Sequence, residues 1–256
     1  MRLTLVQTDT RWHDPETNRT RIEHQLGDLP AGHSDLIALP EMFTTGFTMD
    51  SATQAESMEG DSVQWMRALA GKLQATVAGT LVIRENNAFY NRLIWMPPDG
   101  AAQYYDKRHL FRMAGEDRAY AAGHERPVFR VKNWRVRPTI CYDLRFPVWC
   151  RNDGENYDLL LCLANWPSPR HEAWTILSRA RAIENLACVA VVNRVGRDQT
   201  DNLYLGSSMV IDAKGNTIAD AGDTEGIVHA VLQPQDLVEF RRKFPVHKDA
   251  DEFVLK

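Results

Sequence analysis

The stretch Arg137-Pro-Thr-Ile-Cys141-Tyr-Asp-Leu-Arg-Phe-Pro147 passes from a short apolar segment of β type into a polar turn, and one cysteine marks the change. A cysteine where a strand ends can direct its sulfur into an open cleft. Taken alone, a cysteine is more often a small buried hydrophobe. The functional interpretation of Cys141 therefore depends on what the rest of the chain supplies.

Two other segments supply complementary groups. In Asp35-Leu-Ile-Ala-Leu-Pro-Glu41 a carboxylate follows an apolar run, and in Tyr104-Tyr-Asp-Lys-Arg-His-Leu-Phe111 the amine of Lys107 follows another. A thiol, a carboxylate and an amine, each at the end of a candidate strand, form the pattern of an assembled site rather than of a core.

Length and charge limit the class of protein. The chain has 256 residues and a formal net charge of −4, so it can form one large α/β domain and has no basic footprint for nucleic acid. No apolar run approaches the about 20 residues of a membrane span, and the start of the chain becomes polar too early for a signal peptide. We expect no nucleic-acid or membrane partner. No Ser/Gly/Pro-rich linker divides the chain, so a single domain over residues 1–256 is expected.

The four cysteines, Cys141, Cys150, Cys162 and Cys188, show no Cys-x-x-Cys spacing, which argues against a zinc site. Cys162 and Cys188 lie in apolar runs and are expected to be buried strand thiols. We expect a reduced, cytoplasmic protein without a metal or other cofactor.

Hydrophobic patterning predicts strands that alternate with helices. Strands are expected over 3–7, 36–39, 76–83, 91–96, 103–105, 128–131, 136–140, 159–163, 189–192, 207–211 and 226–232. Helices are expected from Pro15, with Asp14 as N-cap, and over about 62–74, 172–186 and 234–243. Residues 98–100 and 213–216 are hairpin signals. Many strands with few helices fit two sheets packed face to face with helices outside. Pro138 predicts an edge or a bulge in the strand before Cys141.

The expected helix over 172–186 carries an apolar stripe made of Ala173, Ile176, Leu177, Ala180, Ile183 and Ala187. Trp174 and Ala182 are apolar outside this stripe. A helix that is apolar on more than one side can be covered on more than one side, so we expect a homodimer.

The segments around the three reactive residues resemble those of the nitrilase superfamily, the carbon–nitrogen hydrolases that use a Glu-Lys-Cys triad. The similar motifs, in the family's order, are Leu39-Pro-Glu-Met-Phe43, Lys107-Arg-His-Leu-Phe111, Cys141-Tyr-Asp-Leu-Arg-Phe-Pro147, Ala164-Asn-Trp-Pro167 and Arg179-Ala-Arg-Ala-Ile-Glu-Asn185. Residues 107–113, 194–196 and 242–253 are most similar to the bacterial ω-amidase branch. The resemblance implies an α/β fold with the family's four-layer α-β-β-α sandwich, which the strand pattern alone does not fix.

The three groups suit the hydrolysis of an amide. Amides are poor electrophiles, and a route through a thioester divides the barrier between two steps. The thiol of Cys141 must be a thiolate or become one as it attacks, and a neighbouring ammonium such as Lys107 lowers a thiol pKa. Glu41 can take the proton and return it to departing ammonia. The Lys107 ammonium and the backbone N–H of Tyr142 are the natural donors to the oxyanion.

Three further residues near these motifs need an interpretation. The family carries a second glutamate that helps to position the substrate and the hydrolytic water, and Glu116 falls in the matching place; the alternative is a solvated loop carboxylate. Asp143 fits a turn or cap residue better than a catalytic one. His109 suggests a Cys-His protease, but local cysteine-protease signatures are missing, so a structural histidine fits better.

The substrate-binding residues are less well defined by the sequence. An ω-amidase binds a short dicarboxylic monoamide and needs a cation or several donors for the distal carboxylate. Arg145 is a candidate because related carbamoylases use a residue at that place for a carboxylate; a structural salt bridge is the alternative. The aromatic residues beside the motifs either line a small pocket or belong to the core: Phe43, Phe111, Tyr142 and Trp166.

The resemblance thus implies an ω-amidase that acts on 2-oxoglutaramate or 2-oxosuccinamate and releases ammonia through a Cys141 thioester. The alternatives are an N-carbamoyl amino acid amidohydrolase or a nitrilase of the same superfamily. From a different class, a catalytically dead binding module would keep the fold, but the intact Glu41, Lys107 and Cys141 argue against it.

Overall fold

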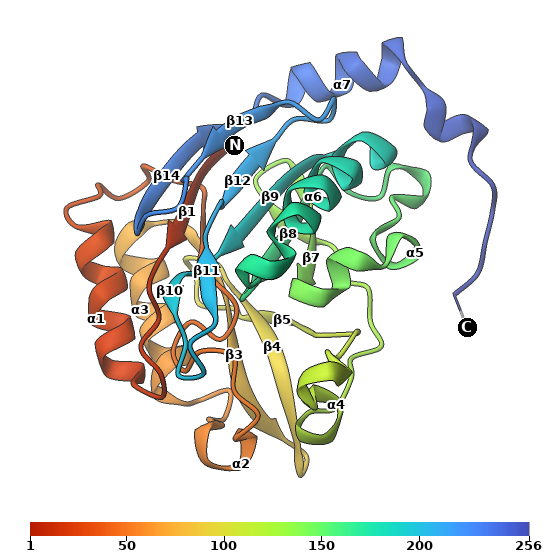
Figure 1. The fold of residues 1–256 in the computed structure, drawn as a ribbon. Helices are drawn as coiled ribbons and strands as arrows, with labels where there is room; N and C mark the ends of the chain where they lie inside the picture. The colour runs from red at the N-terminus through yellow and green to blue at the C-terminus, as the bar shows by residue number, and fades with distance from the viewer. Residues whose placement is uncertain (256) are drawn as a thin grey trace.

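Two six-stranded sheets lie face to face between layers of helices in the computed structural model, which describes residues 1–255 (Figure 1). The strand order is β14-β1-β2-β3-β4-β5 in the first sheet and β13-β12-β9-β8-β7-β6 in the second, and β10 and β11 form a separate two-stranded ribbon. This is the four-layer α-β-β-α sandwich that the family resemblance implies.

The first sheet consists of β1 (Arg2–Gln7), β2 (Leu36–Ala38), β3 (Thr76–Glu85), β4 (Ala88–Met96), β5 (Gln103–Asp106) and β14 (Gly226–Val231). The second consists of β6 (Phe129–Val131), β7 (Trp134–Ile140), β8 (Leu159–Ala164), β9 (Cys188–Asn193), β12 (Met209–Ile211) and β13 (Thr217–Asp220). The ribbon pairs β10 (Val195–Arg197) with β11 (Leu203–Leu205). All eleven expected strands are present, whereas β10, β11 and β13 were not predicted.

The side chains of the central strands point alternately to the two faces of a sheet, which explains how the layers pack. Leu159, Leu161 and Leu163 of β8 belong to the core between the two sheets, whereas Leu160 and Cys162 pack toward the helices. Because successive side chains of a strand point to opposite faces, a continuous apolar run buries both faces of a sheet. The inner strands are therefore unbroken apolar segments in the amino-acid sequence.

Helices cover the outer faces of the sheets. The four longest are α1 (Pro15–Leu26), α3 (Asp61–Leu73), α6 (His171–Asn185) and α7 (Pro234–Lys243), which confirms the four expected helices. Three single-turn helices were not predicted: α2 (Ser51–Gln54), α4 (Glu116–Ala119) and α5 (Pro147–Cys150). The Asp14 side chain caps α1 by accepting from the backbone N–H of Thr17, as expected. Among residues 1–255, no helix is long and apolar enough to span a bilayer.

The apolar stripe of α6 faces the core only in part, because Ala173 and Leu177 pack against the outer side of the second sheet but two isoleucines do not. Ile176 and Ile183 are 55% and 54% exposed, whereas Trp174 and Ala182 are fully buried against the second sheet. Arg181 also lies on the buried face, because its guanidinium donates two hydrogen bonds to the carbonyl oxygen of Leu144. A charged side chain with such partners can be buried, so hydrophobicity alone does not define the buried face of this helix.

Pro138 lies in a strand that has a neighbour on each side of the sheet. The predicted edge position is therefore wrong for the strand as a whole and correct only around Pro138. β7 pairs with β8 on one side from Val136 to Ile140, but β6 on the other side pairs only up to Val136. Pro138 therefore has a strand neighbour on one side only, where a missing N–H is tolerated. The two hairpin signals are confirmed, since 98–100 joins antiparallel β4 and β5 and 213–216 joins antiparallel β12 and β13.

Candidate active site

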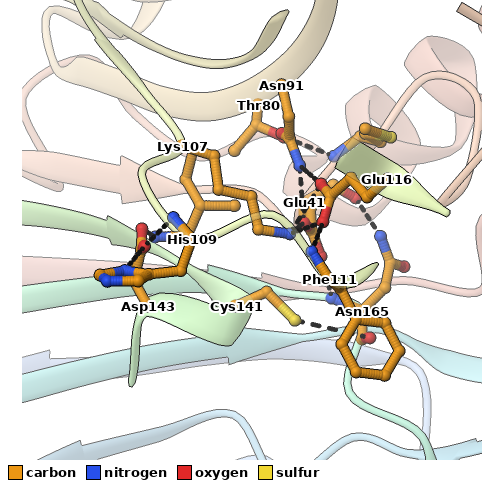
Figure 2. A network of polar contacts seen from close by, with 12 residues as sticks. Glu41, Thr80, Asn91, Lys107, His109, Phe111, Glu116, Cys141, Asp143 and Asn165 are labelled. Carbon is orange, nitrogen blue, oxygen red and sulfur yellow. Dashed lines mark hydrogen bonds and ion pairs between the residues drawn. The ribbon is translucent and has the colours of Figure 1, made fainter. Parts of the chain in front are cut away.

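The carboxyl ends of strands from both sheets meet at one place. Glu41 follows β2 and Lys107 follows β5 in the first sheet, and Cys141 follows β7 and Asn165 follows β8 in the second. In open α/β sheets, ligand sites lie outside the carboxyl ends of the strands. The three residues predicted from the sequence are brought together here, as Figure 2 shows.

Lys107 sits between two carboxylates. Its Nζ lies 2.8 Å from Oε1 of Glu41 and 2.9 Å from both carboxylate oxygens of Glu116. All three side chains are fully buried. Glu116 is therefore not a solvated loop carboxylate, which was the alternative interpretation.

Neutral donors complete the coordination of both carboxylates. The Asn91 amide donates to Oε1 of Glu41 at 2.7 Å and to Oε1 of Glu116 at 3.1 Å. The backbone N–H of Phe111 donates to Glu116 at 2.6 Å, and that of Asn165 donates to Oε2 of Glu41 at 2.8 Å. Every contact to the two glutamates is thus a donor, as ionised carboxylates require.

The electrostatics of the cluster keep Lys107 charged. Burial lowers the pKa of Lys107, but the Glu116 and Glu41 carboxylates outweigh it and hold that pKa well above its usual range. Burial raises the pKa of Glu116, and Lys107 opposes this rise. An ammonium that stays charged is the form that stabilises an oxyanion.

Cys141 occupies a strained backbone position at the start of a 3₁₀ turn (Cys141–Arg145). Its φ of 45° lies in the left-handed region, which non-glycine residues seldom adopt. Such strain persists where the surroundings impose it and is concentrated at active sites. Its Sγ lies 3.8 Å from the carbonyl oxygen of Asn165, beside the Glu41 carboxylate that Asn165 also contacts.

The surroundings of Cys141 favour its neutral thiol over the thiolate. Burial and the Glu41 carboxylate raise its pKa well above the usual range, and Lys107 lowers it by less. Lys107 thus acts in the expected direction but does not set the net shift. Of the two routes considered from the sequence, the one in which Cys141 loses its proton during attack fits this environment.

Asp143 fixes the turn that presents the nucleophile. One carboxylate oxygen accepts from the backbone N–H of Ile140 at 2.9 Å and from the Tyr105 hydroxyl at 2.6 Å. The other accepts from the backbone N–H of His109 at 2.9 Å and is 2.8 Å from its Nδ1. The His109 ring also stacks on Phe146 with centroids 3.7 Å apart. Asp143 is a cap residue and His109 a structural one, as the sequence predicts.

A cavity of about 520 Å³ opens over Cys141 and Lys107. Four of the five predicted substrate-binding residues line it: Phe111, Tyr142, Arg145 and Trp166. Arg145 forms no ion pair within residues 1–255, so the alternative of a structural salt bridge is not supported there; its guanidinium lies 4.9 Å from the centroid of the Trp166 ring.

Phe43 does not line the cavity, and the prediction for it was wrong. Its ring is fully buried between the first sheet and the helices, where it packs against Trp65 at 5.7 Å between centroids. Gly79 makes the space, because a Cβ there would lie 2.8 Å from Cε1 of Phe43. The glycine in the neighbouring strand thus allows an aromatic residue beside a catalytic motif to be part of the core.

Sequence reasoning missed several polar residues of the site. Asn165 follows the apolar run of β8, so its place at a strand end was a signal that could have been used. Asn91 had no such signal, because it lies inside β4. Further polar residues of the cavity come from loops, from the 3₁₀ turn before α6 and from β11: His13, Thr48, Asp50, Arg170, Asp198, Gln199, Thr200, Asn202 and Tyr204. No group of three or more His, Cys, Asp or Glu side chains in the described chain is arranged to hold a metal ion.

Known proteins are similar to this chain over its full length. Residues 2–242 match the family model described as carbon-nitrogen hydrolase. The chain is 43% identical to the omega-amidase YafV of Escherichia coli K12, over all of this chain and 98% of that protein. It is 34% identical to a 2-oxoglutaramate amidase of Bacillus subtilis, over 96% of each.

A solved structure agrees with the fold. A CN-hydrolase superfamily protein from Xanthomonas campestris, with an arsenic adduct in its active site, superposes with a TM-score of 0.97 at 48% identity and covers 100% of this chain and 99% of its own. On the family model, the full-length relatives and this structure, the chain belongs to the carbon–nitrogen hydrolase family.

Proposed function

We propose that this protein is an ω-amidase that hydrolyses a short dicarboxylic monoamide, 2-oxoglutaramate or 2-oxosuccinamate, to the dicarboxylate and ammonia. The observation that carries the proposal is the buried Glu41–Lys107–Glu116 cluster, whose Lys107 lines a cavity together with Cys141 and two arginines. The names of two relatives, an omega-amidase and a 2-oxoglutaramate amidase, support the substrate class.

The first half-reaction forms a thioester on Cys141. Glu41 takes the thiol proton as the sulfur attacks the amide carbonyl, and the oxygen that becomes negative accepts from the Lys107 ammonium and the backbone N–H of Tyr142. The C–N bond then breaks, Glu41 returns the proton to the nitrogen, and ammonia leaves. Surroundings that raise the pKa of the Cys141 thiol suit this order of events, because the base must then act during attack.

The second half-reaction releases the acid. A water molecule gives a proton to Glu41 as it attacks the thioester carbon, the C–S bond breaks, and the proton returns to the sulfur of Cys141. Glu116 holds Lys107 through both of its oxygens and so keeps the ammonium directed at the reacting oxygen. No cofactor takes part in this proposal.

Products distinguish the alternatives. Carbon dioxide released with ammonia would identify a carbamoylase, and turnover of a nitrile would identify a nitrilase. We therefore propose an ammonia-release assay over small amides, N-carbamoyl amino acids and nitriles, with intact-protein mass spectrometry to detect the acyl-enzyme. A Cys141 that forms no adduct with any of these would support a binding module and overturn the proposal.

We also propose that the protein is a homodimer of single-domain chains in the cytoplasm. The exposed Ile176 and Ile183 on α6 support the dimer, because they present apolar surface opposite the face that contacts the sheet. The four cysteines are free thiols in the described chain, which suits a reducing compartment. Light scattering at micromolar concentration should give the dimer mass, and a monomer mass would refute the assembly.

A further inference from the structure

The buried arginines of the described residues are paired with carboxylates or carbonyl oxygens, whereas two half-buried arginines of the cavity are not. Arg92 is held by Asp106 and Glu85, and Arg194 by Asp9 and three carbonyl oxygens. Within residues 1–255, the guanidinium groups of Arg145 and Arg170 have no hydrogen bond or ion pair, although both line the cavity over Cys141.

Aromatic rings hold these two guanidinium groups in place. Arg145 lies 4.9 Å from the centroid of Trp166, and Arg170 lies 5.1 Å from the centroid of Phe111. The backbone of Arg170 is fixed as well, because its carbonyl oxygen accepts from the Trp166 indole at 2.7 Å. A cation that rests on an aromatic face keeps its N–H groups free for a ligand.

The carboxylates around the site mean that an anionic substrate requires additional cations. Glu41 and Glu116 place two carboxylates around the one ammonium of Lys107, and this ammonium already serves the reacting carbonyl oxygen in the proposed mechanism, so it does not serve the distal carboxylate as well. Asp198 adds a carboxylate to the wall, but Thr200, Asn202 and Tyr204 occupy both of its oxygens. A dicarboxylic substrate must therefore find its cation elsewhere in the cavity.

We propose that Arg170 is a specificity-determining residue that holds the distal carboxylate of the substrate together with Arg145. This inference rests on the proposed ω-amidase function and goes beyond it by assigning a residue from the turn before α6. Two planar guanidinium groups from separate elements can bind the two oxygens of one carboxylate, which a neutral amide does not offer.

The test compares two substrates in matched variants. Arg170→Gln should raise KM for 2-oxoglutaramate by roughly tenfold or more, which is about 1.4 kcal/mol, while kcat/KM for neutral butyramide changes less than about threefold. Arg170→Lys should recover only part of the loss, because an ammonium cannot reproduce the planar fork. Arg84→Gln, an exposed arginine at the end of β3, is the control and should change neither substrate.

A double-variant cycle tests whether the two arginines share one carboxylate. Losses from Arg145→Gln and Arg170→Gln should not add in the double variant, because both contact the same group. Competitive inhibition by succinate should weaken in parallel, which reports binding without chemistry.

The outcomes separate this inference from the proposed function. Equal losses on both substrates, or no loss on either, would overturn the role of Arg170 while the wild type still hydrolyses 2-oxoglutaramate. A wild type that hydrolyses butyramide but not 2-oxoglutaramate or 2-oxosuccinamate would overturn the proposed substrate class, and this inference with it.

Discussion

Replacing Lys107 with methionine tests the buried charge cluster directly. The change keeps an unbranched stem but removes an ammonium that contacts Glu41 at 2.8 Å and both oxygens of Glu116 at 2.9 Å. All three residues are fully buried, so water cannot take the place of the ammonium without a structural change. Breaking a buried ion pair by removing one partner costs about 3–5 kcal/mol, and we expect the free energy of unfolding at pH 7 to fall by that amount.

Acid should narrow the stability difference between the wild type and Lys107→Met. Burial raises the pKa of Glu116 and Lys107 opposes this, so the pKa must rise further in the variant. A carboxyl group whose pKa is higher in the folded protein than in the unfolded chain is better tolerated when protonated, so its destabilising effect disappears as the pH falls through the folded pKa. The difference in unfolding free energy should therefore be smaller at pH 5 than at pH 8.

The assay is urea denaturation at one fixed protein concentration and at both pH values. The double variant Lys107→Met/Glu116→Gln should regain part of the stability, because only one buried carboxylate remains. It should not regain activity, since losing an oxyanion donor lowers kcat by about 100-fold or more. Lys72→Met, at an exposed position of α3, is the matched control. A loss below about 1 kcal/mol, or a difference that widens in acid, would refute the reasoning.

Three further changes test other parts of the site. Cys141→Ser should abolish both turnover and the acyl-enzyme seen by mass spectrometry while leaving the melting temperature near that of the wild type; near-normal activity would contradict the thioester route. Asp143→Asn should lower kcat by tenfold or more with little change in KM, because a single amide oxygen cannot accept the contacts now made from Tyr105, Ile140 and His109; an unchanged kcat would show that the turn holds without them. Gly79→Ala should cost about 1–3 kcal/mol of unfolding free energy through overpacking with largely retained kcat, and calorimetry that finds no loss would mean that the ring beside it can move.

The reactive residues were predictable because their signals are local. Glu41, Lys107 and Cys141 each follow an apolar run, and parallel strands bring such ends to one edge of a sheet. The family resemblance added Glu116, whose burial and contact with Lys107 no local pattern indicates. Arg170 carried no signal, because its place in the cavity depends on the packing of Trp166 against the start of α6.

Packing partners decide what the sequence pattern leaves open. Phe43 flanks a catalytic motif, yet Gly79 on the next strand creates the space that buries it. The face of α6 that contacts the sheet includes Arg181, whose partner is a carbonyl oxygen in the turn after Cys141. Both outcomes depend on residues distant in the chain, which periodicity within one element does not describe.

The hydrogen bond from Tyr105 to Asp143 joins the two sheets at the point where the chemistry takes place. Tyr105 ends the first sheet beside Lys107, and Asp143 belongs to the turn that leaves the second sheet at Cys141. The acid–base groups are thus carried by one layer and the sulfur by the other. The catalytic rate therefore depends on how the two sheets are placed relative to each other. A small shift of one sheet over the other would separate the sulfur from the base while each sheet stayed intact. Activity should accordingly disappear at a lower urea concentration than secondary structure does.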